Sequence, residues 1–254
     1  MSQSQFFVRA WVAQQYALGR PHFHSQVVRR IKEYVCTHQL IANVLDVGCG
    51  TGLSTTALRE ITENIVAVDI SQQMLAMVPR DDHINYVASA GENLPIRDGR
   101  FDMVTVSSSF HWLDRSRFLP EAVRVLRPRG WLVIYDNYFL GKMVGNPKYE
   151  VWNRSSYLER YPSPPRDRRP VTRADATSHG LDLAREDTYT NDVSFSLDQL
   201  VSYLLTQTNV IDAIEKGDDN IGTATRWLEE ELGELFLQPR ATFPFAGPIL
   251  YFRK

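Results

Sequence analysis

The chain has 254 residues, 43% of them hydrophobic and 23% charged, and its formal net charge is -2. This length and composition predict one large globular domain, or a core domain that carries an insertion, and they exclude a chain dominated by disorder. A net charge close to zero provides no basic field for a polyanion, so we expect no nucleic-acid partner.

The cysteines and the N-terminal residues indicate the compartment. The two cysteines, Cys36 and Cys49, are too few for a disulfide framework or a zinc ligand set, which favours a reducing, cytoplasmic setting. Residues 1–21 lack the features of a signal peptide, and no apolar run approaches the ~18 residues of a membrane span. The sequence therefore predicts a soluble protein with no membrane partner, and it leaves the oligomeric state open.

Apolar strands and amphipathic helices alternate over the first half of the chain. Residues 25–36 carry apolar side chains at helical spacing and predict a packing helix. Strands are expected at 43–48, 65–70, 84–89, 101–109 and 131–137, and helices at 53–61, 71–78 and 115–126. Ser71 is expected to cap one helix, and "RPRG" at 127–130 is expected to form a turn. This alternation predicts a doubly wound parallel sheet with helices on both faces.

The pattern changes after residue 137. The segment "YPSPPRDRRP" at 161–170 is rich in proline and arginine and cannot form a regular helix or a central strand. We therefore predict an insertion over 138–185, helical around 147–161 and irregular after it. The last part is expected to have a strand near 187–195, helices near 197–207 and 223–236, and a closing strand near 241–254.

The stretch "VLDVGCGTG" at 44–52 places glycines at every second position after the first predicted strand. In an open parallel sheet this strand-to-helix turn is where the backbone approaches a cofactor, and the helix N-terminus favours a carboxylate or phosphate. A plain structural turn is the alternative. The dinucleotide fingerprint needs a glycine where Leu53 stands, which counts against NAD. Asp69 ends the second strand, either to accept hydrogen bonds from a ribose diol or to serve as a turn or helix-capping acid.

Four motifs carry a family resemblance: "VLDVGCGTGLST", "VAVDIS", "AGENLPIRDGRFDMVTVSSSFHWLD" and "FLPEAVRVLRPRGWLVI". In this order they resemble the class I S-adenosylmethionine-dependent methyltransferases, over about residues 16–137. The "FHW" variant and the lead-in "YALGRPHF" are similar to the branch that contains trans-aconitate methyltransferase. The resemblance implies a Rossmann-like α/β fold with a seven-stranded sheet, S-adenosyl-L-methionine as cofactor, S-adenosyl-L-homocysteine as product, and a small-molecule acceptor.

The resemblance also divides the single domain. It implies a helical cover at 1–40, a cofactor-binding core at 41–137, a substrate lid at 138–185, and a C-terminal part at 186–254 that completes the sheet.

The matched positions imply roles for individual residues. The glycines and Asp46 would hold the methionine part of the cofactor, and Asp69 the ribose. Ser107 matches a position whose backbone meets the methionine amino group, while Arg20 would pair with the carboxylate. The cofactor-binding positions implied by the match are Tyr16, Arg20, Asp46, Gly48, Gly50, Gly52, Asp69, Ile70, Met74, Gly91, Glu92 and Ser107.

Two positions depart from the family pattern. Ala90 stands where the family often has an acid for the adenine amino group, so backbone or solvent would have to replace that acceptor. Arg129 stands where a second glycine is usual in the "RPRG" turn.

Phe110, His111 and Trp112 follow the fourth predicted strand, at the edge where an acceptor would lie, so we expect them to line the substrate pocket. His111 is the candidate catalytic residue, although a histidine after a strand is often a structural hydrogen-bonding residue. A base is needed only for an acceptor that must lose a proton, such as a hydroxyl. His22 and His24 have no third ligand at a suitable spacing, so no metal is expected.

The predicted insertion carries two sets of candidate residues. Its arginines suit an acidic small molecule or form a solvated loop, and its aromatic residues line an apolar pocket or simply pack. These arginines are Arg160, Arg166, Arg168, Arg169 and Arg173, and the aromatic residues are Tyr149, Trp152 and Tyr157.

Three functions compete at this point. The first is a methyltransferase that acts on a small molecule, at oxygen. The second is a non-catalytic regulatory module that binds S-adenosylmethionine. The third, a nucleic-acid methyltransferase, is disfavoured because "SSSFHW" stands where an N-P-P-Y type tetrapeptide would follow the fourth strand.

Overall fold

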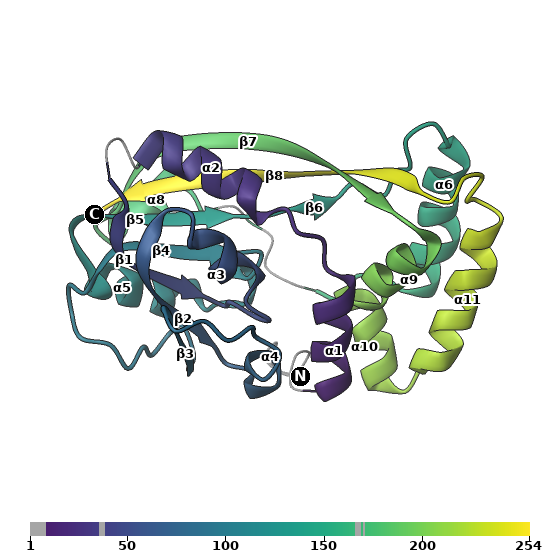
Figure 1. Ribbon diagram of the computed structural model, residues 1–254, viewed down its shortest axis with the longest axis horizontal. Helices are drawn as coiled ribbons and strands as arrows, with labels where there is room; N and C mark the ends of the chain where they lie inside the picture. The colour runs from purple at the N-terminus through teal and green to yellow at the C-terminus, as the bar shows by residue number, and fades with distance from the viewer. Residues whose placement is uncertain (1–8, 36–38, 166–168, 170) are drawn as a thin grey trace. The chain divides into compact units, whose positions relative to one another are not determined.

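The computed structural model describes residues 9–35, 39–165, 169 and 171–254, and Figure 1 shows their helices and strands. The chain forms two compact units. Unit 1 comprises Met1–Pro21, Tyr138–Pro165 and Thr190–Ala246, and unit 2 comprises His22–Asn137, Arg166–Tyr189 and Gly247–Lys254. The boundaries predicted for cover, core, lid and C-terminal part differ from these, and that functional division stays a prediction.

The sheet of unit 2 is built as the alternating pattern predicts. Its parallel strands are β1 (Ile41–Val47), β2 (Thr62–Asp69), β3 (Ile84–Ala88), β4 (Phe101–Ser107) and β5 (Leu126–Tyr135). They lie in the order β3-β2-β1-β4-β5, and β8 (Ala241–Arg253) continues the sheet antiparallel to β5. Along the chain, β2 and β3 are added on one side of β1, and β4 is then added on the other side of β1. The space between the carboxyl ends of β1 and β4 is therefore the switch point, where open α/β sheets bind ligands.

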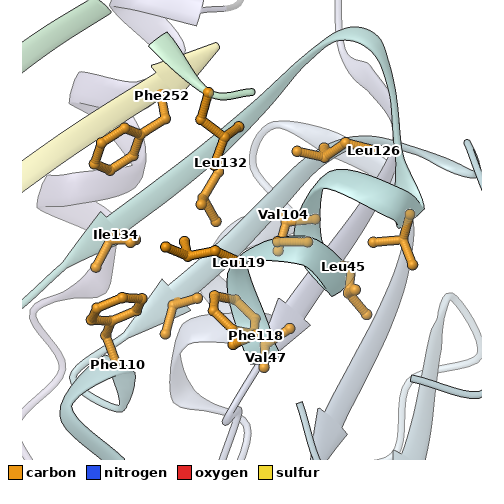
Figure 2. Close-up of a cluster of buried hydrophobic side chains, with 14 of the residues drawn as sticks. Leu45, Val47, Val104, Phe110, Phe118, Leu119, Leu126, Leu132, Ile134 and Phe252 are labelled. Atoms are coloured by element: carbon orange, nitrogen blue, oxygen red, sulfur yellow. The ribbon is translucent and has the colours of Figure 1, made fainter. Parts of the chain in front are cut away.

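Helices cover both faces of this sheet, as predicted for a doubly wound fold. Val44 packs with α2 (His24–Val35) and α3 (Leu53–Leu58) on one face. Its neighbour Leu45 points to the other face, among side chains of α5 (Arg115–Val125) and α8 (Arg173–Ser178). Figure 2 shows this second cluster, with Phe118 and Leu119 of α5 against Val47, Val104 and Ile134. Burial of such side chains stabilises the sheet by about 1.5–3 kcal/mol each.

Two short helices lie in the connections of unit 2. Ser71 caps α4 (Gln72–Leu75) as predicted, since its Oγ accepts the Met74 N–H at 3.2 Å. The 3₁₀-helix η2 (Phe110–Trp112) follows β4.

The prediction of a turn at "RPRG" is wrong. β5 begins at Leu126, and a register shift opposite Phe101–Met103 makes residues 127–130 the irregular start of this strand. Arg129 has a φ of 64°, the left-handed conformation that glycine adopts most readily, and its N–H donates to the Lys254 carbonyl at 3.0 Å. The pairing with the last residue of the chain holds Arg129 in this conformation.

Unit 1 is mainly helical. Its helices are α1 (Ala10–Gly19), α6 (Pro147–Trp152), the π-helical turn η3 (Asn153–Tyr157), α7 (Leu158–Arg160), α9 (Leu197–Leu205), α10 (Thr208–Lys216) and α11 (Ile221–Gly233). The strand β6 (Tyr138–Phe139) pairs with the first half of β8, and β7 (Asp182–Phe195) runs through both units and also pairs with β8. Helices were predicted at α6–α7, α9 and α11, and α1 lies within the helical cover expected at 1–40, whereas α10 was not predicted.

The core of unit 1 is rich in aromatic side chains. Tyr149, Trp152 and Tyr157 are buried there, together with Phe243 and Phe245 of β8. Across the described residues of both units, no helix is long and apolar enough to cross a membrane.

Candidate functional site

The three alternating glycines occupy the turn from β1 to α3, and all have positive φ: 70° at Gly48, 55° at Gly50 and 85° at Gly52. A Cβ at Gly48 would lie 2.4 Å from Ser109 Oγ, and one at Gly52 would lie 2.9 Å from the Tyr86 hydroxyl. A Cβ at Gly50 would meet nothing within 4 Å. Two glycines therefore permit close packing within the protein, and Gly50 faces open space at the switch point.

Asp69 holds this turn from the end of β2. Its Oδ2 accepts the Gly50 N–H at 2.8 Å, and its Oδ1 accepts the Ser71 N–H at 2.8 Å. Burial raises the pKa of Asp69, while the two backbone hydrogen bonds act in the opposite direction. Each oxygen keeps a lone pair for a further donor, so the turn-acid role seen here leaves room for a ribose hydroxyl.

Asp46 is fully buried beneath the turn. Its Oδ2 accepts the hydroxyls of Ser54 and Thr55 at 2.6 and 2.7 Å, and its Oδ1 accepts that of Thr105 at 2.9 Å. Burial raises the pKa of Asp46 and the three hydroxyls oppose that effect. The carboxyl group thus fastens the start of α3 and the middle of β4 to β1.

Three serines continue β4 beside the glycine turn. Because Val47 pairs with Val106, Ser107 is next to Gly48 at the sheet edge. Ser108 adopts a φ of 49° and donates its N–H to the Tyr135 carbonyl at 2.8 Å. Ser109 donates its hydroxyl to the Val47 carbonyl at 3.1 Å. The segment is held in a strained conformation at the switch point.

A buried polar trio lies at the ends of β4 and β5. His24 Nδ1 is 3.1 Å from the Tyr135 hydroxyl and 3.5 Å from Ser107 Oγ. Burial lowers the pKa of His24 to about 3, with a smaller effect from His22, so the imidazole is neutral at physiological pH. Tyr135 was not singled out from the sequence; its position at the end of an apolar strand, opposite Ser107, is the signal that points to it.

The remaining predicted cofactor residues of unit 2 differ in exposure. Ile70 is 55% exposed, whereas Met74 is buried in α4. A Cβ at Gly91 would lie 2.8 Å from the Val47 side chain, so this glycine permits packing. Glu92 accepts the Asp114 N–H at 2.8 Å and so holds the start of α5.

The predicted substrate residues form the helix η2. Phe110 is buried and packs edge-on against Phe118 at a centroid distance of 5.9 Å. His111 and Trp112 are partly exposed, with ring centroids 4.8 Å apart. Phe110 therefore belongs to the core, while His111 and Trp112 have surface from which to reach a ligand.

Tyr16 and Arg20 lie in unit 1, where the structure brings them together. Arg20 Nη2 donates to the Tyr16 hydroxyl at 2.7 Å and to the Thr206 carbonyl at 2.8 Å. The guanidinium also lies 4.3 Å from the centre of the Tyr16 ring.

The candidate residues of the insertion have separate environments. Arg160 forms an ion pair with Asp219 at 2.9 Å, and Arg173 is exposed at the start of α8. The Arg169 carbonyl accepts a hydrogen bond from Arg115. Arg166 and Arg168 lie outside the described residues, as does Cys36. Tyr149, Trp152 and Tyr157 pack in the core of unit 1, which agrees with the alternative that these side chains simply pack.

Metal ligands are not gathered in the described ranges: no three His, Cys, Asp or Glu side chains there could hold one ion.

Known proteins resemble about half of this chain in sequence. A family model described as a methyltransferase domain matches residues 45–134. An uncharacterized methyltransferase of Mycobacterium tuberculosis is 36% identical over 124 residues, 48% of this chain and 49% of the relative. A malonyl-[acyl-carrier protein] O-methyltransferase of Enterobacter lignolyticus is 32% identical over 130 residues, 48% of this chain and 51% of the relative. The matched region thus spans about half the length of these relatives.

Solved structures extend the likeness in fold to nearly the whole chain. A protein from Anaeromyxobacter dehalogenans described as a type II methyltransferase superposes with a TM-score of 0.68 at 19% identity, covering 92% of this chain and 97% of that one. The matches do not single out the trans-aconitate branch. The glycine turn and the acid at the end of β2 both lie within residues 45–134, the part of the chain that matches the methyltransferase-domain model.

Proposed function

We propose that the chain transfers the methyl group of S-adenosyl-L-methionine to an oxygen of a small-molecule acceptor, a carboxylate or a hydroxyl. The observation that carries the proposal is Gly50: its backbone is left-handed, its N–H is held by Asp69, and the space in front of its Cα is open. These features fit a backbone surface against which a cofactor lies.

The residues of unit 2 would have different roles in binding the cofactor. Asp69 would accept hydrogen bonds from the ribose hydroxyls, and exposed Ile70 would cover the adenine. Gly48, Gly52 and Gly91 permit the packing that shapes the turn and the loop beside it. Asp46 would act indirectly, because its oxygens are enclosed by three hydroxyls and none of its surface is exposed.

Methyl transfer requires little covalent chemistry from the protein. The bound cofactor supplies a methyl group on a sulfonium, which is already a good leaving group. The chain then has to hold the acceptor oxygen in line with that methyl group, and such positioning lowers a barrier by roughly 7–11 kcal/mol. The partly exposed His111 and Trp112 follow β4 directly and would contact the acceptor.

The acceptor class decides whether His111 takes part in proton transfer. A carboxylate attacks without losing a proton, whereas a hydroxyl needs a base. The O-methyltransferase among the relatives supports attack by oxygen. If the acceptor is a hydroxyl, His111→Ala will lower kcat much more than it weakens S-adenosylhomocysteine binding. Equal turnover in the two proteins would remove His111 from the chemistry.

The test of the proposed function is product formation. The chain is incubated with S-adenosyl-L-methionine and a panel of small carboxylic acids and alcohols, and S-adenosylhomocysteine is quantified. Acceptor-dependent product supports the methyltransferase. Tight cofactor binding without product for any acceptor, including those in a cell extract, would favour the non-catalytic binding module instead.

A further inference from the structure

The proposed function names no side chain that accepts a hydrogen bond from one cofactor group, the α-ammonium of the methionine part. Asp46, which the family resemblance assigned to this group, is fully enclosed. Ser107 stands beside the glycine turn at the carboxyl end of β4, and 8% of its surface is exposed. Ser107 therefore lies at the edge of the site, and its hydroxyl belongs to the buried trio with His24 and Tyr135.

The trio has one favourable direction of hydrogen bonding. A phenol is a stronger donor than an aliphatic hydroxyl, and a neutral imidazole nitrogen is a stronger acceptor than a hydroxyl oxygen. With the imidazole proton on Nε2, Tyr135 donates to His24 Nδ1 across 3.1 Å, and the Ser107 hydroxyl donates to the Tyr135 oxygen. In this arrangement the Ser107 hydroxyl uses its proton in a hydrogen bond within the protein. The lone pairs of its oxygen are then left to accept from a ligand.

The surroundings keep this direction fixed. Tyr135 is fully buried, and His24 is enclosed by Phe23, whose ring centroid is 4.0 Å away. Burial keeps the His24 imidazole neutral, because it lowers the pKa to about 3. An imidazolium would donate from both nitrogens and would reverse the chain of hydrogen bonds.

We propose that His24 and Tyr135 are positioning residues that orient the Ser107 hydroxyl, so that its oxygen accepts a hydrogen bond from the α-ammonium group of the bound cofactor. This inference rests on the proposed function. It assigns roles to His24 and Tyr135, and the four sequence motifs include neither of these residues.

Two ligands that differ in the amino-acid part test the proposal. S-Adenosylhomocysteine carries the ammonium, whereas 5′-methylthioadenosine lacks it and keeps the adenosine and sulfur. Their Kd values are measured by calorimetry for the wild type, Tyr135→Phe and Ser107→Ala. Tyr189→Phe is the matched control, because its hydroxyl donates to the Asp136 carbonyl at 2.9 Å, outside the trio.

We expect Ser107→Ala to weaken S-adenosylhomocysteine by at least about tenfold, the effect of losing one hydrogen bond to a charged group. Tyr135→Phe should weaken it in the same direction, and both variants should leave 5′-methylthioadenosine within about twofold. Tyr189→Phe should bind both ligands like the wild type. An equal loss for the two ligands, or no loss, in Tyr135→Phe and Ser107→Ala would overturn the proposal. If the wild type binds neither ligand, the proposed function itself fails.

Should Tyr135→Phe fold poorly, His24→Gln tests the same idea from the other end of the trio. The expected result is again a loss confined to the ligand that carries the ammonium. Unchanged discrimination between the two ligands in a folded His24→Gln protein would contradict the positioning role.

Discussion

Replacement of Gly50 by alanine separates the cost of backbone strain from the loss of a ligand surface. Gly50 has a φ of 55°, and a Cβ there meets nothing within 4 Å. The variant is therefore strained without a clash. A left-handed non-glycine residue costs about 1–2 kcal/mol, and each kcal/mol lowers Tm by about 2–4 °C in a protein of this size.

Gly99 offers a matched control in the same unit. Its φ is 61°, and a Cβ there also meets nothing within 4 Å. Gly50→Ala and Gly99→Ala should thus lose the same stability in thermal unfolding. In calorimetry, only Gly50→Ala should lose affinity for S-adenosylhomocysteine, by at least about tenfold, or ~1.4 kcal/mol. Equal affinities in the two variants would refute the assignment of the open space at Gly50 to the cofactor.

Three further changes probe other parts of the account. Asp69→Asn should weaken S-adenosylhomocysteine by about 1–3 kcal/mol, whereas Asp102→Asn, which also removes a carboxylate that accepts a backbone N–H, should not; calorimetry on both variants decides. Because the folded-state pKa of His24 lies near 3 and the unfolded value near 6.5, the unfolded chain gains a proton first as pH falls. The wild type should therefore lose about 1.4 kcal/mol per pH unit below ~6 relative to His24→Gln, and parallel urea-unfolding profiles between pH 7.5 and 4.5 would disprove it. Arg129→Gly should raise the free energy of unfolding by about 1 kcal/mol, because it relieves a φ of 64°; a less stable variant would show that the Arg129 side chain contributes more than the strain costs.

Local patterns in the sequence predict much of unit 2. Each strand there is a short apolar run and each major helix is amphipathic, so their order alone indicates a parallel sheet with two covered faces. The same order predicts that Asp69 and the glycines meet at one edge, because the carboxyl ends of parallel strands share that edge. The hydrogen bond from Gly50 to Asp69 shows that these two sites do meet.

Long-range contacts account for what the sequence does not reveal. Arg129 accepts a left-handed conformation because its N–H pairs with the carbonyl of Lys254, at the other end of the chain. His24 and Tyr135 meet across 111 positions, and no local motif links them. Likewise, Asp46 looks like a cofactor ligand by position, yet three hydroxyls from α3 and β4 surround it in the fold.

The most direct test of the central claim is a calorimetric titration of the wild type with S-adenosyl-L-methionine, S-adenosylhomocysteine and NAD in one buffer. We predict micromolar binding of the first two and none of NAD, since Leu53 stands where the dinucleotide fingerprint requires glycine. Binding of NAD alone, or of none of the three, would contradict the assignment of the glycine turn to S-adenosyl-L-methionine.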